Sequence, residues 1–289
     1  MTGDVGATGG RGEVLALEAT ALRVDYPGAP RVLDDLTFRV RRGVRMAILG
    51  ANGSGKSTLL RSLSGSLTPA TGEIAADGVL LRHRRKDLDL HRRRVQLVLQ
   101  DPDDQLFSAD VFTDVAFGPV NLGLSDDEVR WRVAECLASL GIADLVDRPV
   151  HHLSYGQRKR VALAGALAMG PSTLLLDEPT AGLDPSSSES LVRVLDGLTR
   201  SGVTIVMSTH DVDLAWRWAD EVAVLIDARV MQGSPGDLLS DASLLRRTCL
   251  SRPWQAAMLQ EAGVAWGADG ERPRSVVEVL AALGVRGGV

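Results

Sequence analysis

The sequence GANGSGKS at residues 50–57 is the most informative stretch of the chain, because it has the GxxxxGK[ST] spacing of a loop that wraps phosphate groups. An apolar run at 44–49 precedes it, and a helical pattern runs from 56 to about 66. A loop between a strand and a helix points backbone N–H groups and the positive helix end at a bound anion. Lys56 can then reach the outer phosphates, and the Ser57 hydroxyl can ligate Mg²⁺. The stretch therefore predicts a nucleoside triphosphate site.

Composition is that of an ordinary globular protein. The chain has 289 residues, 45% apolar and 24% charged, enough for one sizeable core with small appendages. A net charge of −5 argues against nucleic acid as a partner. Two cysteines, Cys136 and Cys249, form no disulfide framework. The sequence shows neither a secretory signal nor an apolar run approaching about 18 residues, so we expect a cytosolic protein that can dock on a membrane partner.

Strand-like and helical segments alternate along most of the chain. Alternating apolar and polar residues predict two antiparallel strands at 14–24 and 32–40. Further strands are expected at 44–49, 73–76, 95–99, 173–176, 203–207 and 222–226, and helices at 125–140, 185–200 and 211–219. Such alternation around a phosphate loop predicts an α/β fold with a mostly parallel sheet flanked by helices.

The pattern also divides the chain into regions. Residues 1–12 are rich in glycine and are expected to be disordered, whereas 13–240 form the main domain. Within it, the helical stretch 101–169 is expected to be an insertion into the sheet core. Residues 241–289 form a C-terminal extension with a weak pattern, in which 276–283 could form one short amphipathic helix.

The segment 82–94 is strongly basic. It could attract anionic lipid or nucleic acid, or it could be the solvated face of a helix. The second interpretation is favoured, because most charge runs are solvated.

LLLDEP at 174–179 is an apolar strand that ends in two carboxylates. Burial of such a strand presents Asp177 and Glu178 at its carboxyl end, beside the phosphate loop of an α/β sheet. Asp177 can hold Mg²⁺, and Glu178 can polarise a water that attacks the terminal phosphate. A surface turn with two acids is the simpler alternative, but the phosphate loop upstream argues against it.

Two further segments could face the same phosphates. His210 follows the strand at 203–207, from which it could point at the γ-phosphate, although a lone histidine is usually structural. LSYGQ at 153–157 opens a helix rich in small apolar residues. A serine and a glycine at a helix N-terminus make a second anion-binding surface.

Taken together, these segments resemble the ATP-binding cassette ATPases of membrane transporters, over residues 14–235. GANGSGKS, Gln100, LSYGQ, LLLDEP, AGLD at 181–184 and His210 occur in the order of that family. The resemblance implies a P-loop NTPase core of the RecA-like type, with an N-terminal antiparallel β subdomain and an inserted helical subdomain. It also implies ATP and Mg²⁺ as cofactors.

The resemblance assigns roles to individual residues. Tyr26 would stack on adenine, Gln100 would ligate Mg²⁺ and sense a transmembrane partner, and His210 would position the attacking water. The implied nucleotide-binding residues are Tyr26, Gly50, Asn52, Gly53, Ser54, Gly55, Lys56, Ser57, Thr58, Ser154, Gly156, Gln157 and Asp184; those acting in hydrolysis are Gln100, Glu178 and His210; those holding Mg²⁺ are Ser57, Gln100 and Asp177. Ser154 and Gly156 would contact the γ-phosphate held by a second protomer, and Asp184 would lie across the dimer interface. Tyr155 departs from the family's usual LSGGQ.

Residues 98–124 are similar to the energy-coupling-factor ATPases, especially their cobalt and nickel uptake branch. That branch implies a transmembrane coupling subunit and a membrane substrate-binding subunit as partners. Asp101, Asp103 and Asp104 could be taken for a metal site, but we interpret them as part of an exposed docking loop, because they lack a closed ligand set. His151, His152 and Cys136 likewise indicate no transition-metal site.

The sequence is thus interpreted as an ATPase at the cytoplasmic face of a membrane, working as a homodimer or with a paralogous ATPase. Its importer would carry cobalt, nickel or another small solute such as a vitamin. Two other classes stay open: a non-transport ATPase of DNA repair or translation, and a nucleotide-binding module without hydrolysis. The absence of a long coiled coil or second cassette argues against the first, and Glu178 with His210 argues against the second.

Overall fold

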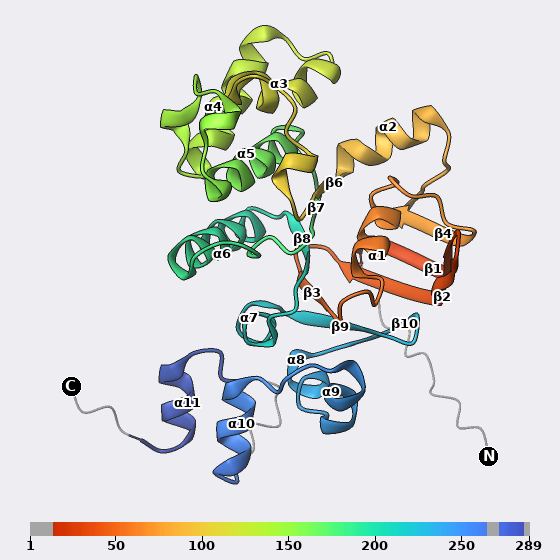
Figure 1. The fold of residues 1–289 in the computed structure, drawn as a ribbon, viewed down its shortest axis with the longest axis vertical. Coiled ribbons are helices and arrows are strands. Elements are labelled where there is room, and N and C mark those ends of the chain that lie inside the picture. The colour runs from red at the N-terminus through yellow and green to blue at the C-terminus, as the bar shows by residue number, and fades with distance from the viewer. Residues whose placement is uncertain (1–13, 265–271, 286–289) are drawn as a thin grey trace.

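The computed structural model describes residues 14–264 and 272–285 of the chain (Figure 1). The prediction of disorder for residues 1–12 lies outside the described residues, as do parts of the C-terminal extension.

The N-terminal part forms a four-stranded antiparallel sheet in the order β2–β1–β4–β5. Its strands are β1 (Leu15–Tyr26), β2 (Ala29–Arg41), β4 (Thr71–Ala76) and β5 (Val79–Leu80). Buried side chains pair across β1 and β2, since Ala19 lies opposite Phe38 and Leu22 opposite Leu36. The predicted antiparallel pair is confirmed, and both strands are longer than expected.

A six-stranded sheet in the order β10–β9–β3–β8–β7–β6 forms the centre of the molecule. Its parallel strands are β3 (Arg45–Leu49), β6 (Val95–Val98), β7 (Thr173–Leu176), β8 (Thr204–Ser208) and β9 (Glu221–Ile226). Every residue of β7 and β8 is buried, as expected for strands covered on both faces. The antiparallel edge strand β10 (Arg229–Gly233) is missing from the predicted elements, because its mixed composition gives no alternating pattern.

Helix α1 (Lys56–Leu63) joins the two sheets. Leu59, Leu60 and Leu63 are fully buried in one cluster with Phe38 of β2 and Ile48 of β3. Burial of each leucine contributes roughly 2 kcal/mol. The helix that follows the phosphate loop is therefore fixed between two layers, and its N-terminus has one orientation.

The opposite face of the central sheet packs on α6 (Pro185–Arg200) and α7 (Val212–Trp218). Their buried side chains include Leu191 and Leu195 of α6 and Trp216 of α7. These two helices were predicted with nearly the observed bounds. A short helix, α8 (Pro235–Leu238), follows β10.

The predicted inserted region consists of α3 (Val111–Asn121), α4 (Asp126–Ser139) and α5 (Tyr155–Ala168), with short 3₁₀ turns at Pro102–Asp104, Ala143–Leu145 and Val150–His152. Figure 1 shows these helices grouped together at one end of the molecule. Gly118 lets α3 approach α5, because a Cβ there would lie 2.3 Å from the Met169 sulfur. The Ser125 hydroxyl caps α4 by accepting from the Glu128 N–H, while the Glu128 carboxylate pairs with Arg132.

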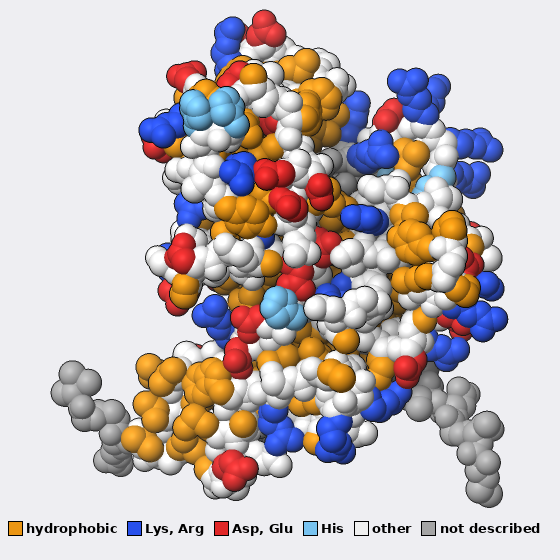
Figure 2. Space-filling view, viewed as in Figure 1, with side chains coloured by type: hydrophobic (Ala, Val, Ile, Leu, Met, Phe, Trp, Pro, Cys, Tyr) orange, Lys and Arg blue, Asp and Glu red, His pale blue; other side chains and the backbone are white. Residues whose placement is uncertain are grey.

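The basic segment forms α2 (Arg85–Arg94). Its arginine and lysine side chains are largely exposed, and Figure 2 shows them gathered at one upper corner of the molecule. His91 is the buried member of the helix, with its Nε2 2.7 Å from the Leu63 carbonyl oxygen. The solvated-face interpretation of this segment therefore agrees with the structure.

The C-terminal extension contains α9 (Ala242–Thr248), α10 (Trp254–Glu261) and α11 (Val276–Ala282). The last agrees with the helix expected at 276–283, whereas α9 and α10 were not predicted. Both helices are short: α9 ends at Cys249 and α10 begins after Pro253, so neither shows a clear periodic pattern in the sequence.

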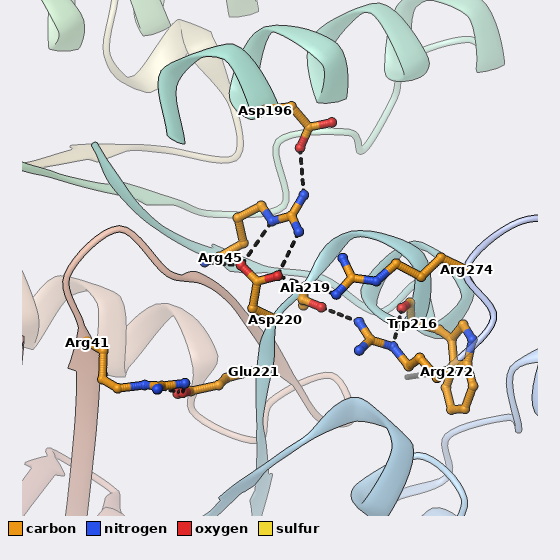
Figure 3. A network of polar contacts seen from close by, with 9 residues as sticks. All are labelled: Arg41, Arg45, Asp196, Trp216, Ala219, Asp220, Glu221, Arg272 and Arg274. Carbon is orange, nitrogen blue, oxygen red and sulfur yellow. Dashed lines mark hydrogen bonds and ion pairs between the residues drawn. The ribbon is translucent and has the colours of Figure 1, made fainter. Parts of the chain in front are cut away.

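A polar network ties this extension to α7 (Figure 3). The Arg272 guanidinium donates to the carbonyl oxygens of Trp216, at 2.7 Å, and of Ala219, and the Trp216 indole donates to Pro273 at 2.8 Å. Arg274 pairs with Asp220, which also binds Arg45 of β3. The extension is thus fastened to the helix that follows His210.

Within residues 14–264 and 272–285, no helix is both long and apolar enough to span a bilayer.

Candidate nucleotide site

The phosphate loop sits between β3 and α1, as predicted. Gly50, Gly53 and Gly55 all have positive φ angles, of 153°, 77° and 102°, which favour glycine. At Gly50 a Cβ would lie 2.6 Å from the Ser54 hydroxyl oxygen, and at Gly55 it would lie 3.0 Å from a Leu33 methyl. Two of the three glycines are therefore required by space as well as by conformation.

Lys56 is buried at the first position of α1. Its ammonium group donates to the carbonyl oxygens of Gly50, at 2.9 Å, and Ala51, at 3.1 Å. The charge is thereby held inside the curve of the loop, next to the positive end of the helix dipole. This is an environment that favours a polyanion.

Asp177 and Glu178 follow β7 at the carboxyl edge of the central sheet, and both are buried. The Ser208 hydroxyl, at the end of the neighbouring strand β8, donates to Asp177 Oδ1 at 2.6 Å and accepts from the Glu178 N–H at 2.9 Å. Ser208 thus fixes both acids. It was missed by the sequence analysis, because only the register of β7 against β8 reveals it.

His210 lies two residues beyond β8, with its side chain largely exposed. Its Nδ1 is 2.8 Å from Glu178 Oε2, so that a protonated Nδ1 donates to the carboxylate. The structure therefore brings His210 to the acid with which the sequence analysis grouped it.

The loop and the acids share one hollow of about 390 Å³. Its lining residues, taken from the phosphate loop, β2, the end of β6 and the end of β7, are Val32, Asn52, Gly53, Gly55, Lys56, Ser57, Thr58, Gln100, Asp177 and Glu178. Segments more than 100 residues apart thus converge on one space. Had the acids lain elsewhere, the nucleotide interpretation would have failed.

The oxygen atoms in this hollow fit Mg²⁺. Ser57 offers a hydroxyl, Gln100 an amide carbonyl and Asp177 a carboxylate, which are the hard ligands that Mg²⁺ prefers. Elsewhere in the described ranges, groups of three or more His, Cys, Asp or Glu side chains able to hold a metal ion are absent, the acidic loop at 101–104 included.

Tyr26 closes β1 near the same loop. Its hydroxyl is 3.5 Å from the Thr58 hydroxyl, and 36% of the residue is exposed. An exposed ring beside the phosphate loop is available to stack on a base.

Ser154, Gly156 and Asp184 are not among the described residues that line the hollow. Ser154 caps α5 in a capping box, in which the Gln157 amide oxygen accepts from the Ser154 N–H at 2.9 Å. Asp184 caps α6, and its bond with the Ser187 hydroxyl holds the pKa of that carboxyl below its usual value. These two helix starts therefore do not meet the phosphate loop of their own chain.

Tyr155, which departs from the family's usual segment, is packed against its neighbours. Its hydroxyl donates to the Gln100 carbonyl oxygen at 3.4 Å, and its ring lies over Gly182, where a Cβ would come within 2.9 Å of the ring. The start of α5 is thus connected both to Gln100 and to the AGLD turn.

Fold and site together define a P-loop nucleoside triphosphatase. Residues 33–181 match the family model described as ABC transporter. The chain belongs to the ABC transporter family, and it is an ATPase of that family, of the energy-coupling-factor type.

Known relatives agree with this assignment. The chain is 54% identical to the cobalt import ATP-binding protein CbiO of Rhodobacter capsulatus over 238 residues, which are 82% of this chain and 85% of that protein. It is 42% identical over 272 residues to the energy-coupling factor transporter ATP-binding protein EcfA of Methanocaldococcus jannaschii, covering 91% and 98% of the two chains.

Solved structures give the same result. CbiO1 of Clostridium perfringens, part of the ABC transporter complex CbiONQ, aligns with a TM-score of 0.73 and 40% identity over 86% of this chain and all of that one. The ATP-binding cassette MJ0796, a dimer in a post-hydrolysis state with ADP and phosphate, aligns with a TM-score of 0.69 and 26% identity over 76% and 98%.

Proposed function

We propose that this chain hydrolyses ATP with Mg²⁺ as one half of a dimer, and that it drives a membrane importer of cobalt or nickel ions from the cytoplasmic face. The observation that carries the proposal is the single hollow shared by Lys56, Asp177 and Glu178. The hollow supports the proposal because the glycine loop proposed to bind a triphosphate shares it with the two carboxylates that hydrolysis needs.

The geometry supports a separate role in hydrolysis for each group of residues in the site. Glu178 polarises the attacking water and accepts its proton, while His210, hydrogen-bonded to Glu178, orients the carboxylate. The glycine loop and Lys56 bind the phosphates. Ser57, Gln100 and Asp177 would hold Mg²⁺, which when bound neutralises charge on the phosphate oxygens.

A dimer is proposed because one chain lacks the second half of the phosphate contacts. Ser154 and Gly156 open a helix outside the hollow, where they are available to a nucleotide on another chain. ATP would contact both chains and so favour the closed pair, and hydrolysis would remove that bridge. The dimeric structure of MJ0796 supports this arrangement, whether the partner is a second copy or a paralogue.

A docking surface for the membrane partner is proposed between the inserted helices and α2. Phe107 and Phe117 are 64% and 51% exposed and meet edge to face, with ring centroids 4.7 Å apart. They line a hollow of about 560 Å³, together with Arg85 and Arg92 of α2. Asp103, four residues before Phe107, pairs with Arg158 of α5 at 2.8 Å, which connects the docking loop to the helix that Ser154 caps.

The cargo proposal comes from the CbiO protein of R. capsulatus and from CbiO1 of the CbiONQ complex. It is tested by co-expressing the chain with its membrane partner subunits and measuring uptake of cobalt and nickel by vesicles supplied with ATP. ATP-dependent uptake of either ion, lost in Lys56→Ala, is the expected result. Uptake of a vitamin but of neither ion would overturn the cargo and leave the ATPase intact.

A further inference from the structure

Lys159 is a buried lysine on α5, one turn beyond Ser154. Only 7% of it is exposed, and its ammonium group donates to the carbonyl oxygens of Glu178 and Pro179, each at 3.1 Å. A buried lysine is costly unless it is hydrogen-bonded, and here both bonds go to the segment that carries Glu178, the proposed base of hydrolysis. Lys159 is one of only three lysines in the chain.

Glu178 has a backbone that must be held in place. Its φ angle is 45°, in the left-handed region that non-glycine residues rarely adopt. Its N–H donates to the Ser208 hydroxyl at 2.9 Å, and its carbonyl oxygen accepts from Lys159 and from the Ala181 N–H. Ser208 and Lys159 therefore hold the two peptide units that flank the Cα of Glu178.

The side chains around Lys159 keep its ammonium group beside the Glu178 carbonyl oxygen. Lys159 lines a small apolar hollow together with Val98, Leu163 and Leu176, and its ammonium group lies 5.4 Å from the centre of the Tyr155 ring. The charged groups that face it are Glu178, Asp101 and Asp177. Burial lowers the pKa of Lys159 to about 8, so the group stays mainly protonated at neutral pH.

We infer that Lys159 is a positioning residue, which holds the Glu178 peptide and links the start of α5 to the catalytic carboxylate of the same chain. The inference rests on the role proposed above for Glu178. Because the start of α5 does not line the hollow of its own chain, Lys159 connects the place where a second chain's nucleotide would sit with this chain's own hydrolytic acid. The contacts of Tyr155 with Gln100 and Gly182 lie on the same path.

The test is Lys159→Met, with Lys86→Met as the matched control. Lys86 is exposed on α2, outside the nucleotide site. We expect kcat for ATP hydrolysis to fall roughly 10- to 100-fold in Lys159→Met, as for other misplaced catalytic groups, with KM for ATP nearly unchanged. Lys159→Arg, which keeps charge and donors, should restore part of kcat. Lys86→Met should match the native enzyme.

A double-mutant cycle separates positioning from general damage. In a Glu178→Gln background, Lys159→Met should not lower the residual single-turnover rate further, because the group it positions is already disabled. An equal loss in both backgrounds, or a native kcat in Lys159→Met, would overturn the inference. Should Lys159→Met not fold, Lys159→Gln replaces it in the same cycle. A native protein without ATPase activity would instead overturn the proposed function.

Discussion

Glu178 shows how much one residue depends on its contacts at this site. Its N–H, its carbonyl oxygen and its carboxylate each have a partner, on β8, α5 and the segment that carries His210. Only 8% of the residue is exposed, so its position relative to the phosphate loop is closely defined. A group held this firmly can act without rearranging first.

Glu178→Gln should abolish turnover while leaving ATP binding. The amide keeps the shape of the side chain but is a very weak base, so hydrolysis should slow by roughly 100- to 10,000-fold. The measurements are steady-state phosphate release and equilibrium binding of ATP. The control is Glu73→Gln on the exposed part of β4, and a native rate in Glu178→Gln would remove Glu178 from its role.

Lys159 should make stability depend on pH. Its pKa falls from 10.5 to about 8 on folding, so between these values the unfolded chain binds more protons than the folded chain. Stability should therefore rise with pH in this window. Between about pH 7 and about pH 9 the gain is on the order of 1 kcal/mol.

Comparison with Lys159→Met isolates this effect. Burial raises the pKa of Cys136 from 9.0 to about 11, which destabilises the folded chain above pH 9.0 in both proteins alike. Urea unfolding at the two pH values should show the native protein gaining relative to Lys159→Met as pH rises. If the difference in unfolding free energy between the native protein and Lys159→Met does not change with pH, the burial of the Lys159 ammonium group is contradicted.

At the scale of elements, α5 connects most of the functional surfaces. Its first turn carries Ser154 and Gly156, its second turn holds Glu178 through Lys159, and Arg158 pairs with Asp103 of the proposed docking loop. In the proposed assembly, this one helix would contact the docking loop, the nucleotide of a second chain and the hydrolytic acid. Because all three contacts lie on one helix, coupling between these surfaces would not require a long series of intervening residues.

Replacing Asp103 and Asp104 by Asn and Phe107 by Ala should uncouple the ATPase from its membrane partner. The change removes the ion pair with Arg158 and one of the two exposed rings, but it touches none of the residues that line the nucleotide hollow. ATP affinity should stay within about twofold, while co-purification with membranes and uptake should be lost.

The matched control for this loop is the combination Asp126→Asn, Asp127→Asn and Trp131→Ala on α4. It removes two exposed acids and one exposed ring from the same group of inserted helices. Unchanged co-purification and uptake in the loop variant, or an equal loss in the control, would refute the docking assignment.

Sequence patterns predicted the residues that line the site better than the residues that hold them in position. The phosphate loop, Asp177 and Glu178 were found because each lies at the end of an apolar strand, and such ends share one edge in a parallel sheet. Ser208 and Lys159 were missed, because their roles depend on the register of β7 against β8 and on how α5 packs. Nothing local distinguishes a buried lysine from the arginines that flank it.

The same reasoning applies to the fold. Long periodic segments such as α6 were predicted almost to the residue. The edge strand β10 and the helices α9 and α10, of five to eight residues, were missed, because polar residues interrupt their short apolar runs. Helix α11 is equally short but was predicted, because apolar residues fill most of it.

At the scale of the whole molecule, the C-terminal extension holds the end of α7 in place through Arg272. Arg272 is 7% exposed and donates to two carbonyl oxygens at the end of that helix, and burial lowers its pKa to about 10. A cation at a helix C-terminus also complements the helix dipole. The contacts of Arg272 therefore stabilise α7, the helix that follows His210.

Arg272→Met should lower the free energy of unfolding by about 1–3 kcal/mol, because it leaves the carbonyl oxygens of Trp216 and Ala219 without this donor. Chemical denaturation measures the change. Arg246→Met on the exposed face of α9 is the control and should shift stability by less than about 0.5 kcal/mol. Equal stability of Arg272→Met and the native protein would show that the extension is not fastened in this way.

The separation between the start of α5 and the loop around Lys56 has a kinetic consequence. In the proposed dimer each site is built from two chains, so the turnover of a solitary copy should vanish on dilution. In the dilute range the initial rate should grow with about the square of the concentration of chains, and become linear once pairing saturates. A rate strictly proportional to concentration throughout would mean that a single copy completes the reaction by itself.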